Sequence, residues 1–377
     1  MEKRSKALFQ CASLLLGSAT LFADVNFCPP NPCRVAACCP EIEDCCECNV
    51  CPPTSEITPN AGPCVKDGTN IYVTADFIYW TAREDNLEFA MTESTAATSG
   101  GTAHPSKGRV FRPETRWRPG FKIGAGHDFC YDGWDIYAEY TWYRVSNTRN
   151  SITASSNQVI LDAFWFVNTP NNPAVNLFLE ADGRWRLDFN VVDFEVGRNF
   201  YVSPRLMLRP FCGLKGTWQK QKLKVDFENF FSSFATNVFS MNNRMKIWGV
   251  GILFGLDTSW HLSRSISLFA NLAASALWEQ FKVNRFDNEF IPTTNVNSSL
   301  VNVMDRFHNV RPVLEWMLGA RWETWFSCDQ YHFAAEAGWE EQVWFSQNNF
   351  IRLPGTGSCH NGDLTFQGLT TKVRLDF

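Results

Sequence analysis

The sequence predicts an all-β protein: a transmembrane antiparallel β-barrel of about 10 strands (range about 10–16), preceded by an irregular segment rich in Cys and Pro. Three observations predict it. From Thr69 onward, apolar residues recur with a period of two; many of these stretches reach the roughly 9–11 residues that cross a tilted bilayer; and short and long connections alternate. After the N-terminal region no run of about 18 apolar residues could form a spanning helix, which leaves a closed barrel.

Residues 1–23 have the features of a secretory signal peptide. Lys3, Arg4 and Lys6 precede an apolar stretch from residue 7 to residue 22, and Ala23 precedes Asp24 as a cleavage point. We therefore expect an exported chain, with the signal peptide cleaved, in a compartment where disulfides persist.

Residues 24–66 form a cysteine-rich segment that we expect to lie in the periplasm. Of the 14 cysteines, those in this segment are Cys28, Cys33, Cys38, Cys39, Cys45, Cys46, Cys48, Cys51 and Cys64. The Cys48-x-x-Cys51 spacing also fits a zinc half-site or a redox motif, but export favours disulfides over metal. Since the number in the segment is odd, at least one cysteine cannot pair within it.

Residues 67–377 form the predicted barrel. Its ten expected strands are 69–82, 119–130, 133–145, 184–198, 204–220, 244–260, 265–281, 309–325, 331–345 and 364–377. Long connections are expected at 84–118, 146–183, 222–243, 283–308 and 346–363, and short ones at 130–133, 199–204, 261–265 and 327–330. An even number of strands places both ends of the barrel on the periplasmic side.

The alternation separates a lipid-facing side from an inner side in each strand. In "GWDIYAEYTW" (133–142) apolar and aromatic residues occupy every second position, and Asp135 and Glu139 fall on the opposite face. Trp248 and Trp260 share a face 12 residues apart, which in a tilted strand is roughly 30 Å, close to an apolar band with its aromatic girdles.

The polar faces supply the pore-lining candidates. They are Asp135, Glu139, Arg205, Arg209, Lys215, Asp257, Arg311, Glu315, Arg321, His332, Glu336, Glu340, Lys372 and Arg374. Their mixed signs predict cross-strand pairing and weak ion selectivity. A ten-stranded barrel leaves a narrow or plugged interior, in which Gly249, Gly251 and Gly255 would leave some room. The terminal strand ends on Phe377, the expected signal for the barrel-insertion machinery.

Enzymatic and nucleic-acid functions are not predicted. The net charge of -5 and pI near 5.8 argue against a nucleic-acid surface, and no G-x-S-x-G or H-E-x-x-H motif occurs. We therefore expect no catalytic, cofactor-binding or metal-binding residues. An outer-membrane protease would need acidic and His residues at the barrel rim, where Asp85, His104 and His308 are candidates by position only.

Several segments resemble a known family. They are "ADFIYWTARED" (75–85), "WRPGFKIGAG" (117–126), "GWDIYAEYTW" and "VDFEVGRNFYVSPRLMLRPFCGLK" (192–215). These are similar to the Legionella pore-forming major outer membrane protein family and to the major-outer-membrane-protein-like porins of environmental chlamydiae, over residues 69–377. The resemblance implies a barrel with a pore-forming role, and its chlamydial side implies cysteine-rich envelope proteins held by disulfides.

Two functions follow as hypotheses. The first is an outer-membrane channel for small hydrophilic solutes, cross-linked by disulfides through its N-terminal cysteines. The alternative is a structural envelope protein whose barrel anchors a disulfide network without significant conductance. The expected partners are outer-membrane lipid, the insertion machinery and disulfide partners in the envelope, with a homo-oligomer as a further candidate.

Overall fold

The computed structural model divides the chain into two compact units, Met1–Glu56 and Ile57–Phe377. The residues that it describes all belong to the second unit. They are 62–63, 65, 68–94, 108–129, 132–154, 158–161, 165, 177–230, 238–292, 294–327, 329–352 and 361–377. The predicted signal peptide and all nine cysteines of the cysteine-rich segment lie outside them.

The described residues form β-strands and connections without a helix. The strands are β1 Ile71–Glu84, β2 Ala90–Ser94, β3 Val110–Phe111, β4 Trp117–Asp128, β5 Trp134–Thr153, β6 Gln158–Leu161, β7 Leu177–Arg198, β8 Phe200–Ser203, β9 Leu206–Phe230, β10 Val238–His261, β11 Ile266–Ile291, β12 Val296–Phe326, β13 Tyr331–Asn348 and β14 Gly362–Asp376. Within these ranges, no helix is long and apolar enough to cross a membrane.

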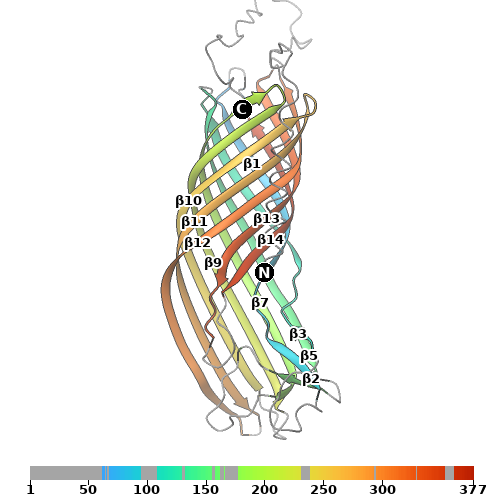
Figure 1. The fold of residues 1–377 in the computed structure, drawn as a ribbon, viewed down its shortest axis with the longest axis vertical. Helices are drawn as coiled ribbons and strands as arrows, with labels where there is room; N and C mark the ends of the chain where they lie inside the picture. The colour runs from blue at the N-terminus through green and yellow to red at the C-terminus, as the bar shows by residue number, and fades with distance from the viewer. Residues whose placement is uncertain are drawn as a thin grey trace, which may run out of the picture. The chain divides into compact units, whose positions relative to one another are not determined.

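Ten of these strands close into a barrel (Figure 1). The antiparallel ring runs β1, β4, β5, β7, β9, β10, β11, β12, β13 and β14, and β14 pairs with β1. The short strands β2, β3, β6 and β8 pair beside the ring. Closure removes the open sheet edges, so the backbone groups of the wall are paired within the barrel. The ten predicted strands are thus confirmed.

One end of the barrel carries the short connections. The β4–β5 turn includes Asp132 and Gly133 with positive φ angles of 56° and 70°, a conformation that Asp and Gly accept more readily than other residues. The C-terminus reaches the same end, where the backbones of Ile71 and Phe377 exchange hydrogen bonds of 3.2 and 3.0 Å (top of Figure 1).

The parts of the strands nearest this end have an apolar outer face. In β1, outward-facing Ile71, Val73, Phe77 and Tyr79 are exposed, while Tyr72, Thr74, Asp76 and Ile78 on the opposite face are buried. Trp248 and Trp260 are both exposed on β10, as their shared parity predicts, with apolar side chains between them. We call this part of the barrel the belt half and the part beyond it the loop half.

The predicted long connections are corrected by the structure. The stretch 283–308 belongs largely to β11 and to β12, which has 31 residues, so residues 292–295 alone connect these strands. Residues 222–230 and 238–243 likewise extend β9 and β10. In these extensions the outer face is mostly polar, with Phe286 and Met304 as exposed apolar residues. The regular apolar outer alternation that identifies membrane strands therefore stops before the strands end.

Candidate functional site

The barrel interior changes character along its axis. In the belt half it holds buried charged side chains joined in ion pairs, with aromatic rings beneath several of the cations. In the loop half it holds a large cluster of apolar side chains. These two layers make up the candidate site, because any solute that crossed the barrel would have to pass both.

Arg209 of β9 forms the centre of one ionic group in the belt half. Its Nη2 lies 2.6 Å from Asp135 Oδ1, and its Nη1 lies 2.9 Å from both Glu195 Oε2 and Asp257 Oδ2. Three carboxylates from β5, β7 and β10 therefore converge on one guanidinium. Buried charges need such pairing because, without a partner, nothing offsets the free-energy cost of removing the charge from water.

Lys122 and Lys372 form a second group, across β4, β5, β13 and β14. Lys122 Nζ lies 2.8 Å from Glu340 Oε1 and 3.7 Å from Glu139 Oε1. Lys372 Nζ lies 3.6 Å from Glu139 Oε2. The Tyr137 hydroxyl donates to the same Glu139 Oε2 at 2.7 Å, so a single carboxylate connects two cations and a phenol.

Other charged residues are paired in the same manner. Lys215 Nζ lies 3.0 Å from Asp193 Oδ2 and 2.7 Å from Glu315 Oε1, with the Lys215 side chain only 2% exposed. His332 Nδ1 lies 2.7 Å from Asp376 Oδ2, and Arg321 Nε lies 2.8 Å from Glu336 Oε1. The expected cross-strand pairing is therefore present, and His332, Glu336 and Glu340 each contact different partners.

The structure places thirteen of the fourteen pore-lining candidates on the inner face. Arg374 pairs with Asp128 and Asp376. The ion pairs described above include Asp135, Glu139, Arg209, Lys215, Asp257, Glu315, Arg321, His332, Glu336, Glu340 and Lys372. Arg311 donates to Asn349 Oδ1 at 3.1 Å.

For Arg205 the prediction of a pore-lining position is wrong. It lies in the exposed turn between β8 and β9 and not on the inner wall. The turn interrupts the two-residue alternation, so a parity count extended through it assigns the wrong face.

The expectation that the inner glycines leave free space in the barrel is also wrong. A methyl group at Gly255 would lie 2.1 Å from Phe211 Cζ, and one at Gly249 would lie 2.6 Å from Glu279 Cγ. At Gly251 it would meet the backbone oxygen of residue 276 at 2.0 Å. Neighbouring side chains and backbone already fill the space that the missing Cβ atoms leave.

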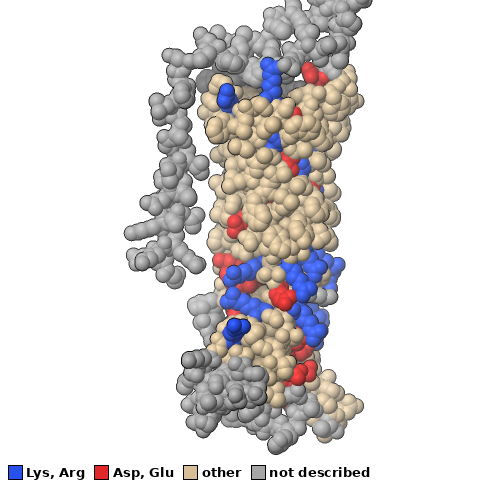
Figure 2. All heavy atoms as spheres, turned by 90° about the vertical axis from the view of Figure 1, so that its right-hand side faces the viewer, with Lys and Arg blue, Asp and Glu red and all other residues tan. Residues whose placement is uncertain are grey.

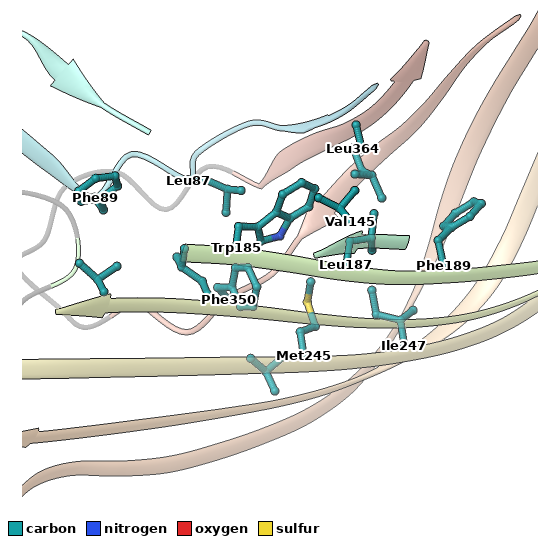
Figure 3. Close-up of a cluster of buried hydrophobic side chains, with 14 of the residues drawn as sticks. Leu87, Phe89, Val145, Trp185, Leu187, Phe189, Met245, Ile247, Phe350 and Leu364 are labelled. Carbon is teal, nitrogen blue, oxygen red and sulfur yellow. The ribbon is translucent and has the colours of Figure 1, made fainter. Parts of the chain in front are cut away.

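Apolar side chains fill the loop half (Figure 3). Wall residues such as Trp185, Phe189 and Ile247 meet Leu87 and Phe350, which come from connections between strands. Phe189 packs against Trp344 and Phe366 with ring centroids 5.2 and 4.5 Å apart. Packing of this kind excludes water from the barrel axis.

The segment 349–352, which follows β13, crosses this interior. The Ile351 carbonyl accepts hydrogen bonds from Asn243 Nδ2 at 3.0 Å and from Arg285 Nη1 at 3.2 Å. Arg352 Nη2 donates to the Asn86 carbonyl at 2.6 Å. The segment is therefore held by the neighbouring strands β10 and β11 and by the connection that follows β1. Sequence analysis assigned it to a long connection, and no local pattern indicates that it turns inward.

A cavity of about 250 Å³ lies beside Glu84, Arg112 and Trp185. The packed apolar cluster fills the interior of the loop half.

The remaining candidates are placed as follows. His308 stacks on Trp278 on the outer surface, with ring centroids 4.7 Å apart, and Asp85 pairs with Arg83; His104 lies outside the described residues. Among the described cysteines, Cys212 is a free thiol on the outer face of β9. Phe377 pairs with Ile71 as described, and its role as an insertion signal stays a prediction.

Comparisons with solved structures give low likenesses. The outer membrane protease OmpT from Escherichia coli is 12% identical with a TM-score of 0.37, covering 82% of this chain and 97% of that one. The Pseudomonas putida toluene transporter TodX is 8% identical with a TM-score of 0.28, covering 82% and 90%. A Pseudomonas aeruginosa FadL homologue is 8% identical with a TM-score of 0.23, covering 81% and 89%. These TM-scores are too low to indicate a shared function.

No curated protein matches the chain significantly. A family model described as "Legionella pneumophila major outer membrane protein precursor" matches residues 61–377, most of the chain and the whole barrel. The match agrees with the closed ten-stranded ring, its apolar belt and its aromatic girdles. The protein is therefore a porin-like barrel of the bacterial outer membrane, and the chain belongs to the Legionella major outer membrane protein family.

Proposed function

We propose that the barrel is a passage for small hydrophilic solutes and that the described conformation is its closed state. One observation carries the proposal. The loop half is closed partly by connecting segments, above all residues 349–352, while the belt half beneath them is lined with charged and polar groups. Segments that connect strands can move without breaking the barrel wall, whereas wall strands cannot.

The contacts of the crossing segment identify what must change for the passage to open. The hydrogen bonds to the Ile351 carbonyl and from Arg352 to the Asn86 carbonyl must break, and Phe350 must leave the apolar cluster. The charges below would then face an aqueous path. Since cations and carboxylates alternate there, we expect weak selectivity between anions and cations.

Single-channel recording of the full chain in planar bilayers tests this proposal. The tether variant is Asn243→Ala with Arg352→Ala, and the matched control is Asn288→Ala with Arg264→Ala, which removes one Asn and one Arg away from the segment. We expect brief, infrequent steps from the wild type, longer open times from the tether variant, and wild-type behaviour from the control. Silence from all three proteins would contradict a passage.

A structural envelope protein is the second candidate, and the filled interior favours it. Disulfide cross-linking would then depend on the nine cysteines of residues 24–66, which lie outside the described residues. Non-reducing gels of intact envelopes test it: oligomers that a thiol reductant dissolves, together with silent bilayers, would support this function over a passage.

A further inference from the structure

The outer surface of the barrel carries a row of four cations on adjacent strands. Lys220 of β9 is the register partner of Lys246 on β10. Lys246 is in turn opposite Lys282 on β11, and Lys282 is opposite Arg306 on β12. All four have the outward parity, and neighbouring strands lie about 4.8 Å apart, so the row spans roughly 14 Å. We call these four residues the cation row.

The cation row has few protein counter-charges. Asp188 on β7 is the register partner of Lys220, but its carboxylate pairs with Arg144 on β5 and Arg186 on β7. Among the described residues, none of the four side chains of the row forms an ion pair. Lys222 and Arg244, opposite each other on β9 and β10, add two further cations beyond the row. Like charges directly opposite each other destabilise a sheet, so the row is a place where bound anions would relieve repulsion.

The row also lies at a defined height. Two residues toward the belt, the same four strands carry Trp218, Trp248, Gln280 and His308 in one register row. Trp248 Nε1 donates to Gln280 Oε1 at 2.8 Å, and His308 stacks on Trp278. This is an interfacial girdle, and two residues along a tilted strand raise the cations by only about 5 Å.

On the face shown in Figure 2, which is the right-hand side of Figure 1, the tan belt also gives way to a band with many Lys and Arg and some Asp and Glu. The belt lies toward the short turns, so the band lies at the outer-leaflet boundary. Anions at that depth belong to lipid head groups, and phosphate groups are what clustered Lys and Arg bind.

We propose that the cation row of Lys220, Lys246, Lys282 and Arg306 binds the phosphate groups of a glycolipid in the outer leaflet, with the Trp girdle against its acyl chains. The inference is independent of solute passage, because every residue of the site lies on the outside of the wall.

Binding of detergent-solubilised diphosphoryl lipid A to the folded full chain tests the proposal, with the tryptophan emission of the adjacent girdle as the signal. The comparison ligands are the same glycolipid without phosphates and inorganic pyrophosphate. We expect saturable, salt-sensitive binding of the diphosphoryl lipid alone. Equal binding of the dephosphorylated lipid would overturn the phosphate contact, and pyrophosphate binding of equal strength would overturn a lipid ligand.

The test variant is Lys246→Gln with Lys282→Gln, and the matched control is Arg149→Gln with Arg184→Gln, which removes the same charge from side chains paired with Asp182. At roughly fivefold per cation near a membrane surface, the test variant should bind about 30-fold more weakly. The control should bind like the wild type. Equal losses of binding in both variants would contradict a specific role of the cation row. Unchanged binding in the test variant would show that the cation row does not bind the lipid.

Discussion

The belt half and the loop half are built from the same strands with opposite polarity. In the belt half of β9, outward Leu214 and Trp218 alternate with inward Lys215 and Gln219. Further along the strand, outward Lys222 and Lys224 alternate with inward Leu223 and Val225. The period of two continues, but the apolar face moves from the outside to the inside.

The surrounding solvent explains the exchange. Against lipid, outward side chains must be apolar, and the interior holds the polar groups. Beyond the lipid the wall meets water on the outside, so the barrel is stabilised as a soluble sheet protein is, by an apolar interior. The two halves should consequently respond in opposite ways to the same kind of substitution.

The largest effect is expected from an unpaired charge in the belt half. In Lys215→Met, Asp193 and Glu315 lose their shared cation inside the barrel. We expect a loss of about 3–5 kcal/mol in the free energy of unfolding, measured by urea unfolding in lipid vesicles. Arg264→Met, in an exposed turn, should change the free energy by less than about 0.5 kcal/mol; comparable losses would show that the ionic interior is hydrated enough to tolerate free carboxylates.

The apolar interior of the loop half should respond to a cavity. Leu223 of β9 is fully buried in the cluster, and Leu223→Ala should cost about 2–5 kcal/mol. The same change at lipid-facing Leu268 should cost about 1–2 kcal/mol, because acyl chains refill the lost volume. If urea unfolding in vesicles gave the reverse order, the loop-half cluster would not be a packed core.

The outer face of β11 should distinguish lipid from water. Leu272 lies in the belt and Asn284 lies in the loop half, with the same parity on one strand. Leu272→Arg should cost about 2–4 kcal/mol, and Asn284→Arg about 0–1 kcal/mol. Folding yields and unfolding free energies in vesicles measure both, and equal penalties would contradict the boundary between the halves.

The smallest effect is expected from an exposed ion pair. Arg198 Nη2 lies 2.5 Å from Asp132 Oδ1 in the turn region. Because water screens this pair, Asp132→Asn should cost about 0–1 kcal/mol, in contrast with Lys215. Unfolding at low and at high salt measures the effect, and a loss near that of Lys215→Met would mean that burial does not decide the strength of these pairs.

Sequence reasoning succeeded where lipid imposes the pattern. The ten strands, the outward Trp248 and Trp260 and most inner charges follow from alternation against an apolar outside. It failed beyond the girdle, although "KQKLKV" (220–225) is itself alternating, because an outward apolar face was required of every strand. Partners such as Lys122 and Glu340, 218 residues apart, depend on the register of the closed ring, which no local pattern contains.

The segment 349–352 illustrates a different limit. Its residues make contacts with strands more than 60 residues distant, through Asn243 and Arg285, and its composition is that of an ordinary connection. Its inward path depends on the space left by the inner side chains of the loop half. That space exists only once the strands have extended beyond the belt.

The polarity exchange is tested most directly by spin labels on β11 of the full chain, in a background with every cysteine replaced by serine. Labels at Leu272→Cys and Asn284→Cys share one outer face, and relaxation by dissolved oxygen or by a water-soluble nickel chelate reports lipid or water. The account predicts that oxygen relaxes the label at 272 and the nickel chelate relaxes the label at 284. Relaxation of both labels by oxygen alone would place the loop half in lipid and contradict it.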